Sequence, residues 1–109
     1  MRSELDDRLC MRFPDLFTER HGNPQDTGMC WGFTCGDGWY SLIYAFCEEI
    51  ERMKLYDDLP PVVITQVKSK LGSLRIHWRG GDERARSMGE LIRTISEHID
   101  EDTGAWRIR

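Results

Sequence analysis

The 109-residue sequence lacks a long hydrophobic run, and no window approaches the ~18 consecutive apolar residues of a membrane-spanning helix. Its start, Met1–Asp7, is charged and lacks the apolar segment that a secretory signal peptide requires. We therefore expect a protein of the cytoplasm, in which the four cysteines are thiols in a reducing compartment.

An excess of positive charge is also absent, since the formal net charge is −4. This argues against a dedicated DNA-binding protein, whose domain is typically strongly basic. The charge is uneven, because residues 1–60 are acidic overall and residues 61–109 are slightly basic. The basic residues of the second half form a cluster: Lys68, Lys70, Arg75, Arg79, Arg84 and Arg86. This cluster predicts a solvated hairpin face or a nucleic-acid surface, and one acidic half with one basic hairpin suits a protein partner equally.

Internal repeats and low-complexity segments are missing as well. A chain of 109 residues with 39% apolar and 31% charged residues is typical of a globular protein with one modest core. We therefore expect residues 1–109 to form a single domain.

Apolar residues at spacings of three and four predict three helices. The first contains Leu5, Leu9 and Phe13, with Ser3 as its N-cap and Pro14 at its end. The second follows Asp37 as N-cap and ends before Pro60. Its apolar stripe is Trp39, Leu42, Ile43, Phe46, Ile50 and Met53.

The third helix is predicted to follow Asp82 as its cap and to end at Thr103–Gly104. We expect Trp106 to anchor the remaining tail to the core. The apolar stripe of this helix is Met88, Leu91, Ile92, Ile95 and Ile99.

Residues 62–68 are rich in β-branched side chains, and residues 74–79 alternate between apolar and polar side chains. Together they predict a hairpin with strands at 62–68 and 74–79. Met29–Cys35 is either a third strand or an extended loop. Along the second strand, Leu74, Ile76 and Trp78 face one side, and Arg75, His77 and Arg79 face the other. We expect an α+β fold in the order ααββα, with about three helices on one face of a small antiparallel sheet.

The four cysteines leave three interpretations open: buried thiols, a zinc site, or redox and disulfide chemistry. A zinc site would use Cys10, Cys30, Cys35 and Cys47, with nitrogen ligands available from His21, His77 and His98. Structural zinc sites usually contain a tight Cys-x2-4-Cys pair in each half. This chain has one Cys-x4-Cys pair, so we predict no metal and no cofactor.

Cys35 is the best candidate for a nucleophile, because it precedes the predicted second helix, whose N-terminal dipole lowers a thiol pKa. His21 or His77 would act as the base, and Asp37 would orient it. A cap and turn residues explain the same positions without catalysis. Gly36-x-Gly38 lacks the third glycine of a dinucleotide-binding loop. We therefore predict no catalytic residue and no enzyme.

Aromatic residues are dense between positions 31 and 40, where they predict either core packing or a hot spot for a protein partner. Trp39 belongs to the helical stripe. The residues that we predict to contact a partner are Trp31, Phe33, Tyr40, Arg75, His77 and Arg79.

The sequence Cys-Trp-Gly-Phe-Thr-Cys-Gly-Asp-Gly-Trp-Tyr at 30–40 precedes a helical pattern and the hairpin sequence Thr-Gln-Val-Lys-Ser-Lys-Leu-Gly-Ser-Leu-Arg at 65–75. This arrangement resembles a family of small phage and prophage proteins, most of which have no assigned activity. The resemblance covers residues 11–81. It implies a phage setting and no particular reaction.

Taken together, these observations predict a non-enzymatic phage or prophage accessory protein that binds a host bacterial protein or ribonucleoprotein complex. An inhibitor of a bacterial defence system, such as a CRISPR–Cas effector complex, fits the setting that the resemblance implies. A nucleic-acid-associated regulator that uses the basic hairpin is one alternative. A zinc- or thiol-dependent protein is the other. The oligomeric state stays open.

Overall fold

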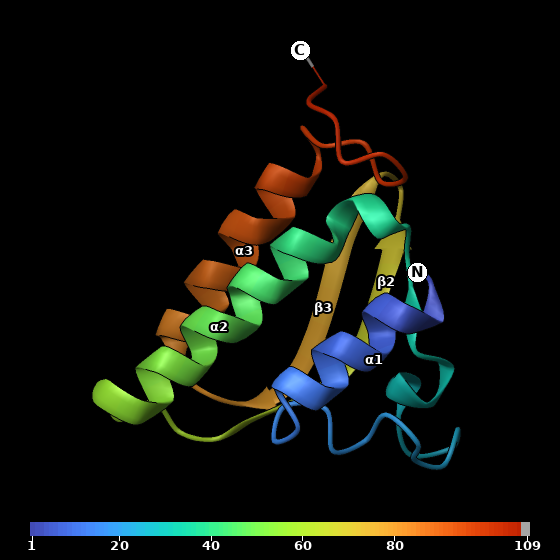
Figure 1. The fold of residues 1–109 in the computed structure, drawn as a ribbon. Coiled ribbons are helices and arrows are strands. Elements are labelled where there is room, and N and C mark those ends of the chain that lie inside the picture. Colours follow the sequence, from blue (N-terminus) through green and yellow to red (C-terminus); the bar gives the residue numbers. More distant parts are fainter. Residues whose placement is uncertain (108–109) are drawn as a thin grey trace.

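The computed structural model describes residues 1–107, which form an α+β fold (Figure 1). The elements, with η for a 3-10 helix, are α1 (Ser3–Arg12), η1 (Gly28–Trp31), β1 (Phe33–Thr34), η2 (Asp37–Trp39), α2 (Tyr40–Tyr56), β2 (Val62–Lys70), β3 (Ser73–Gly80) and α3 (Glu83–Ser96). The predicted α+β class and the order of two helices, a hairpin and a third helix are confirmed.

The sheet contains three strands in the order β1-β2-β3. β2 and β3 pair antiparallel as the predicted hairpin, with Lys70 opposite Ser73 beside the turn. β1 is the third strand, but it pairs parallel with β2, so the sheet is mixed rather than antiparallel throughout. Because α2 connects β1 to β2, the chain can return to the same end of the sheet, which parallel pairing requires.

The hydrophobic core lies between the helices and one face of the sheet. In Figure 1, α1 and α2 lie in front of the strands, and α3 runs beside β3. Ile43 and Phe46 of α2 are fully buried, as are Ile64 and Val67 of β2.

None of the α-helices in residues 1–107 covers the opposite face of β2 and β3, which we call the open face. The segment before β1 reaches part of it, where Glu19 pairs with Arg79 and Gly28 lies beside Gln66.

The starts of the first two helices differ from the prediction. Ser3 is the first residue of α1, and Arg2 precedes it without a side-chain cap. Asp37 begins η2 and does not cap α2, which starts at Tyr40. The Asp37 carboxylate instead accepts from the backbone N–H of Arg2 at 2.8 Å and pairs with Arg2 Nε at 3.1 Å. Both predicted caps were wrong: Ser3 lies inside α1, and the Asp37 carboxylate is used in a contact between distant segments.

α3 begins as predicted but ends earlier. The Asp82 carboxylate accepts from the N–H of Arg84 at 3.0 Å, which confirms this cap. The helix ends at Ser96, and the predicted end at Thr103–Gly104 was wrong.

The segment after Ser96 folds back because it packs against η2. The indole N–H of Trp39 donates to the carbonyl of Ile99 at 3.0 Å, and the N–H of Gly38 donates to the carbonyl of Glu101 at 2.7 Å. Ile99 therefore lies in a loop, where it bridges to Trp106. The side chain of Trp106 is 76% exposed, so the prediction that it anchors the tail to the core was wrong.

Candidate partner-binding face

The β2–β3 hairpin carries four of the six basic residues that the sequence singled out, Lys68, Lys70, Arg75 and Arg79, and the other two, Arg84 and Arg86, lie on α3. Lys68 pairs in register with Arg75, and Gln66 pairs with His77.

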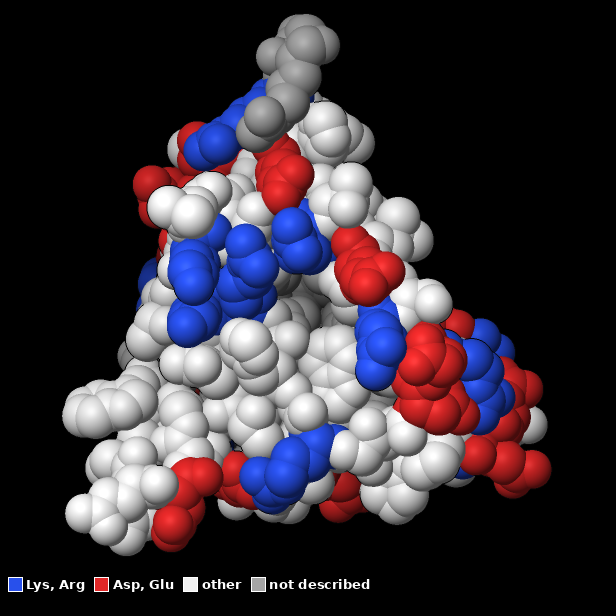
Figure 2. Space-filling view, turned by 180° about the vertical axis from the view of Figure 1, so that it is seen from behind, with Lys and Arg blue, Asp and Glu red and all other residues white. Residues whose placement is uncertain are grey.

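Leu74 is buried and Ile76 and Trp78 pack against the core, whereas His77 and Arg79 are exposed, in agreement with the predicted alternation. Arg75, predicted on the exposed side, is half-buried. Figure 2 shows Lys and Arg gathered on this side of the molecule, beside a hollow in the surface.

Some of these cations have acidic partners. Arg79 forms an ion pair with Glu19, whose pKa is lowered mainly by the hydrogen bond from Arg79. Arg84 pairs with Asp82 at 2.8 Å. These contacts satisfy the charge of both arginines within the fold.

Arg86 pairs with Glu83 at 3.2 Å, but three members of the basic cluster behave differently. Lys68, Lys70 and Arg75 form no ion pair with any residue in 1–107, and we call these three the unpaired cations. Arg75 also has a buried Nε–H without a hydrogen-bond acceptor in this part of the chain. Burial, followed by the charges of Lys68, Arg75 and Lys70, lowers the pKa of His77. The face therefore combines like charges that lack internal compensation.

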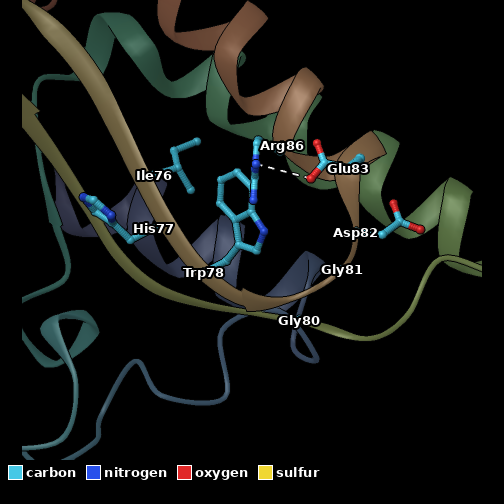
Figure 3. Close-up of a pocket in the computed structure, with 8 residues that line it drawn as sticks. All are labelled: Ile76, His77, Trp78, Gly80, Gly81, Asp82, Glu83 and Arg86. Atoms are coloured by element: carbon cyan, nitrogen blue, oxygen red, sulfur yellow. Dashed lines mark ion pairs between the residues drawn. The ribbon is translucent and has the colours of Figure 1, made fainter.

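A groove runs between β3 and α3, next to the unpaired cations. It consists of a wider hollow of about 460 Å³ and a narrower one of about 180 Å³. Both are lined by Ile76, His77, Trp78 and Arg86, and we call them together the β3–α3 groove. Figure 3 shows the Trp78 ring between the two elements, with Arg86 in front of it and paired with Glu83 at 3.2 Å.

Gly89 of α3 shapes this groove. A Cβ atom at Gly89 would lie 2.5 Å from Cη2 of Trp78, so only glycine lets the indole approach the helix backbone this closely. The Trp78 ring also contacts Phe46, with ring centroids 5.2 Å apart. Gly89 was not predicted as part of the site, although a glycine inside an otherwise continuous helical pattern is a signal for such a close approach.

The aromatic residues predicted to contact a partner occupy three different environments. Trp31 is 69% exposed on η1 and is available to a partner. Phe33 is only 4% exposed and packs edge-to-face on Phe17, with ring centroids 5.2 Å apart. Tyr40 is half-buried beside Tyr44. Phe33 is therefore a core residue and offers no contact surface to a partner. Its strand, β1, pairs with β2, and its ring belongs to the hydrophobic core.

The cysteines occupy apolar or partly buried positions. Cys35 and Cys47 are buried, and Cys10 and Cys30 are half-buried. In residues 1–107, no three His, Cys, Asp or Glu side chains lie together in a way that can hold a metal ion.

The environment of Cys35 is the reverse of the one that the sequence suggested. Burial raises the pKa of its thiol to about 12, whereas a nucleophilic cysteine needs a lowered pKa. The residue precedes the short η2 and not α2, so it lies away from the first turn of the long helix. This geometry does not favour a thiolate at Cys35.

No protein-family model, curated protein or solved structure matches the chain. None of the helices in residues 1–107 combines the length and the apolar character that a membrane span requires.

Proposed function

We propose that this protein is a non-enzymatic phage or prophage accessory protein that binds a host bacterial protein through the open face of its sheet. The observation that carries the proposal is the absence of ion-pair partners for the unpaired cations within residues 1–107. Lys68 lies opposite Arg75, and like charges directly opposite each other destabilise a pair of strands. An acidic partner surface would relieve this repulsion, so the arrangement favours binding over a purely structural role.

The geometry supports a contact surface better than a catalytic site. The Cys35 thiol has a raised pKa. The groove beside the cations is lined by His77, arginines, carboxylates and apolar side chains, and no cysteine or serine within residues 1–107 lies in it. A specific protein contact needs ~800 Å² on each partner and no reactive group. Trp31 adds an exposed aromatic residue of the type that is common in such contacts.

As the target we propose a bacterial defence complex, with a CRISPR–Cas effector complex as the first choice. The support for this setting is the resemblance of residues 30–40 and 65–75 to small phage and prophage proteins. A small domain can inhibit such a complex by occupying a surface that the complex needs.

The proposal is tested by the plating efficiency of a phage on a host whose CRISPR–Cas system targets it. We expect expression of the wild-type protein to raise plating efficiency, and the double variant Lys68→Glu with Arg75→Glu to lose this effect. Arg8→Glu, a single charge reversal at an exposed position on α1, is the control for changed surface charge elsewhere and should retain it. If the wild-type protein leaves plating unchanged, the proposed target is wrong.

A second candidate function is a nucleic-acid-associated regulator, because the same unpaired cations can contact phosphates. The net charge of −4 favours a protein partner instead. Titration with duplex and single-stranded DNA separates the two. Salt-dependent affinity tighter than ~10⁻⁶ M, with a slope reduced by about one for each of Lys68→Ala and Arg75→Ala, would favour the nucleic-acid function.

A further inference from the structure

In the part of the chain that the structure describes, residues 1–107, β3 is the last strand of the sheet, so one of its edges has no neighbouring strand. Along an antiparallel strand, the main-chain groups of successive residues point alternately to the two sides. The N–H of Leu74 donates to Ser96 Oγ at 2.9 Å, which shows that Leu74 points away from β2 and towards α3. By this alternation, the N–H and C=O groups of Ile76 and Trp78 also point away from β2, towards the free edge of β3.

β2 gives the same result independently. Ile64 lies opposite Trp78 and donates its N–H to the carbonyl of Leu16 at 2.8 Å, on the side away from β3. The carbonyl of Val67, opposite Ile76, accepts from Thr34 Oγ at 3.1 Å on that same side. The amide and carbonyl groups of Ile76 and Trp78 are therefore left for a partner at the free edge.

The β3–α3 groove lies along this free edge, since Ile76 and Trp78 line both of its hollows. Figure 2 shows the hollow opening to the same side as the basic residues, and Figure 3 shows the space between β3 and α3. The edge is closed at one end by the bond from Leu74 to Ser96 and at the other by Gly80, where φ is +85°. The stretch of edge between Leu74 and Gly80 is long enough for a short extended segment.

The charge of the groove differs between its two hollows. The wider hollow includes Asp82 and Glu83, which already pair with Arg84 and Arg86. The narrower hollow is bordered by arginines and one carboxylate: Arg75, Arg86, Arg93 and Glu90. Arg75 alone among these arginines has no ion pair in residues 1–107, and its Nε–H lacks an acceptor. An acidic side chain entering the narrower hollow would complement this guanidinium.

We infer that an extended, acidic segment of a partner protein adds as a fourth strand to the free edge of β3. Its main chain pairs with the amide and carbonyl groups of Ile76 and Trp78, and one of its carboxylates binds Arg75. In strand addition of this kind, main-chain hydrogen bonds provide affinity, and pockets for alternate side chains provide specificity. The inference rests on the proposed function, and it names the chemistry of the partner segment.

The test is an NMR titration of the full chain, labelled with ¹⁵N, with three capped hexapeptides. The first alternates glutamate and valine, the second replaces glutamate by lysine, and the third carries methyl groups on alternate backbone nitrogens of the acidic peptide. We expect the acidic peptide to shift the amide signals of Ile76 and Trp78 and to slow their exchange with solvent. The lysine and methylated peptides should leave both signals in place.

Two variants sharpen the test. Arg75→Glu should weaken binding of the acidic peptide by about tenfold, as expected for the loss of a charge-assisted contact. Arg8→Glu makes the same charge change on α1 and should leave the affinity unchanged. Circular dichroism verifies that both variants are folded.

Several results would overturn strand addition. If the acidic and the methylated peptide shift only Lys68 and Lys70, and do so equally, the face attracts acids by charge alone, and the proposed function survives without the inference. No shift by the acidic peptide also rejects it. If sedimentation shows a dimer in which the amides of Ile76 and Trp78 are protected without peptide, the edge binds a second copy of this chain. Failure of the plating assay, by contrast, rejects the proposed target and leaves the peptide result intact.

Discussion

Two groups of charged residues differ in how the fold satisfies them. Asp6 and Arg20 are mostly buried, with side chains 11% and 21% exposed, and they are joined by hydrogen bonds of 3.0 Å from Nε and 2.8 Å from Nη2. Nη1 of Arg20 also donates to the carbonyl of Cys30 at 3.2 Å. The unpaired cations on the open face have no comparable contact within residues 1–107.

Under the proposed function, the difference is one between a structural use of charge and a binding use. The Asp6–Arg20 pair connects α1 to the segment that contains η1, because its two residues and Cys30 come from three parts of the chain. Within residues 1–107 the unpaired cations form no ion pair, and Lys68 and Arg75 lie opposite each other across the hairpin as like charges. Substitutions in the first group should therefore change stability, and substitutions in the second should change binding.

The largest expected effect follows from Arg20→Ala. The variant leaves the mostly buried Asp6 carboxylate without its partner, so we expect the free energy of unfolding to fall by about 2–4 kcal/mol. Urea denaturation measures the change. Arg86→Ala removes an exposed pair with Glu83 and should cost less than about 0.5 kcal/mol. Equal effects of the two variants would contradict the structural role of the Asp6–Arg20 pair.

Cys35→Ser tests whether the buried thiol has a role beyond packing. A hydroxyl in place of the buried thiol should lower the free energy of unfolding by about 1–2 kcal/mol. The folded variant should keep the effect on phage plating, because the raised thiol pKa excludes a ready thiolate at neutral pH. A folded variant without activity would indicate thiol chemistry. About one tightly held metal ion per chain in elemental analysis would instead support a zinc site.

Much of the fold follows from local patterns in the sequence. The period-two alternation in Leu74–Arg79 predicts which side chains face the open side, because side-chain direction in a strand depends only on position. The end of α3 could not be predicted in this way. Residues beyond Ser96 continue an apolar helical pattern, but the hydrogen bond from Trp39 to Ile99 holds them in a loop, and its partners are 60 residues apart.

The candidate site was also predictable only in part, because contacts between residues far apart in the sequence decide which cations are paired. The sequence identifies the cations, but it does not show that Arg79 pairs with Glu19, 60 positions away, whereas Arg75 does not. Likewise, the motif at 30–40 does not separate the exposed Trp31 from the buried Phe33. The groove depends on contact between Trp78 and Gly89, which becomes visible only when α3 packs against β3.

Lys68→Glu tests the role of the like charges on the open face. Its expected effect on the free energy of unfolding is smaller than those of Arg20→Ala and Cys35→Ser. An acidic side chain opposite Arg75 replaces a repulsive pair by an attractive one, so we expect the free energy of unfolding to rise by about 0.2–1 kcal/mol. The same variant should weaken binding of the acidic peptide. Arg8→Glu on α1 is the control for the change in net charge. A variant that is less stable than the wild type would show that Lys68 makes a stabilising contact within the fold.

The smallest expected effect concerns pH, through His77. Burial and the neighbouring Lys68, Arg75 and Lys70 hold the pKa of His77 below its ordinary value of about 6.5. The unfolded chain therefore binds a proton at a higher pH than the folded protein does. It follows that stability falls as the pH drops through about 6.5 towards the folded pKa, and that it is regained above this range.

His77→Gln removes this contribution and leaves the other titrating groups in place. We expect the variant to lose less stability than the wild type between about pH 7.5 and 5.5, as measured by urea denaturation at each pH. Over the same range, protonation of His77 adds positive charge beside the unpaired cations, so wild-type affinity for the acidic peptide should rise while stability falls. A wild-type protein that gains stability relative to the variant at low pH would show that His77 faces a carboxylate and not the cations.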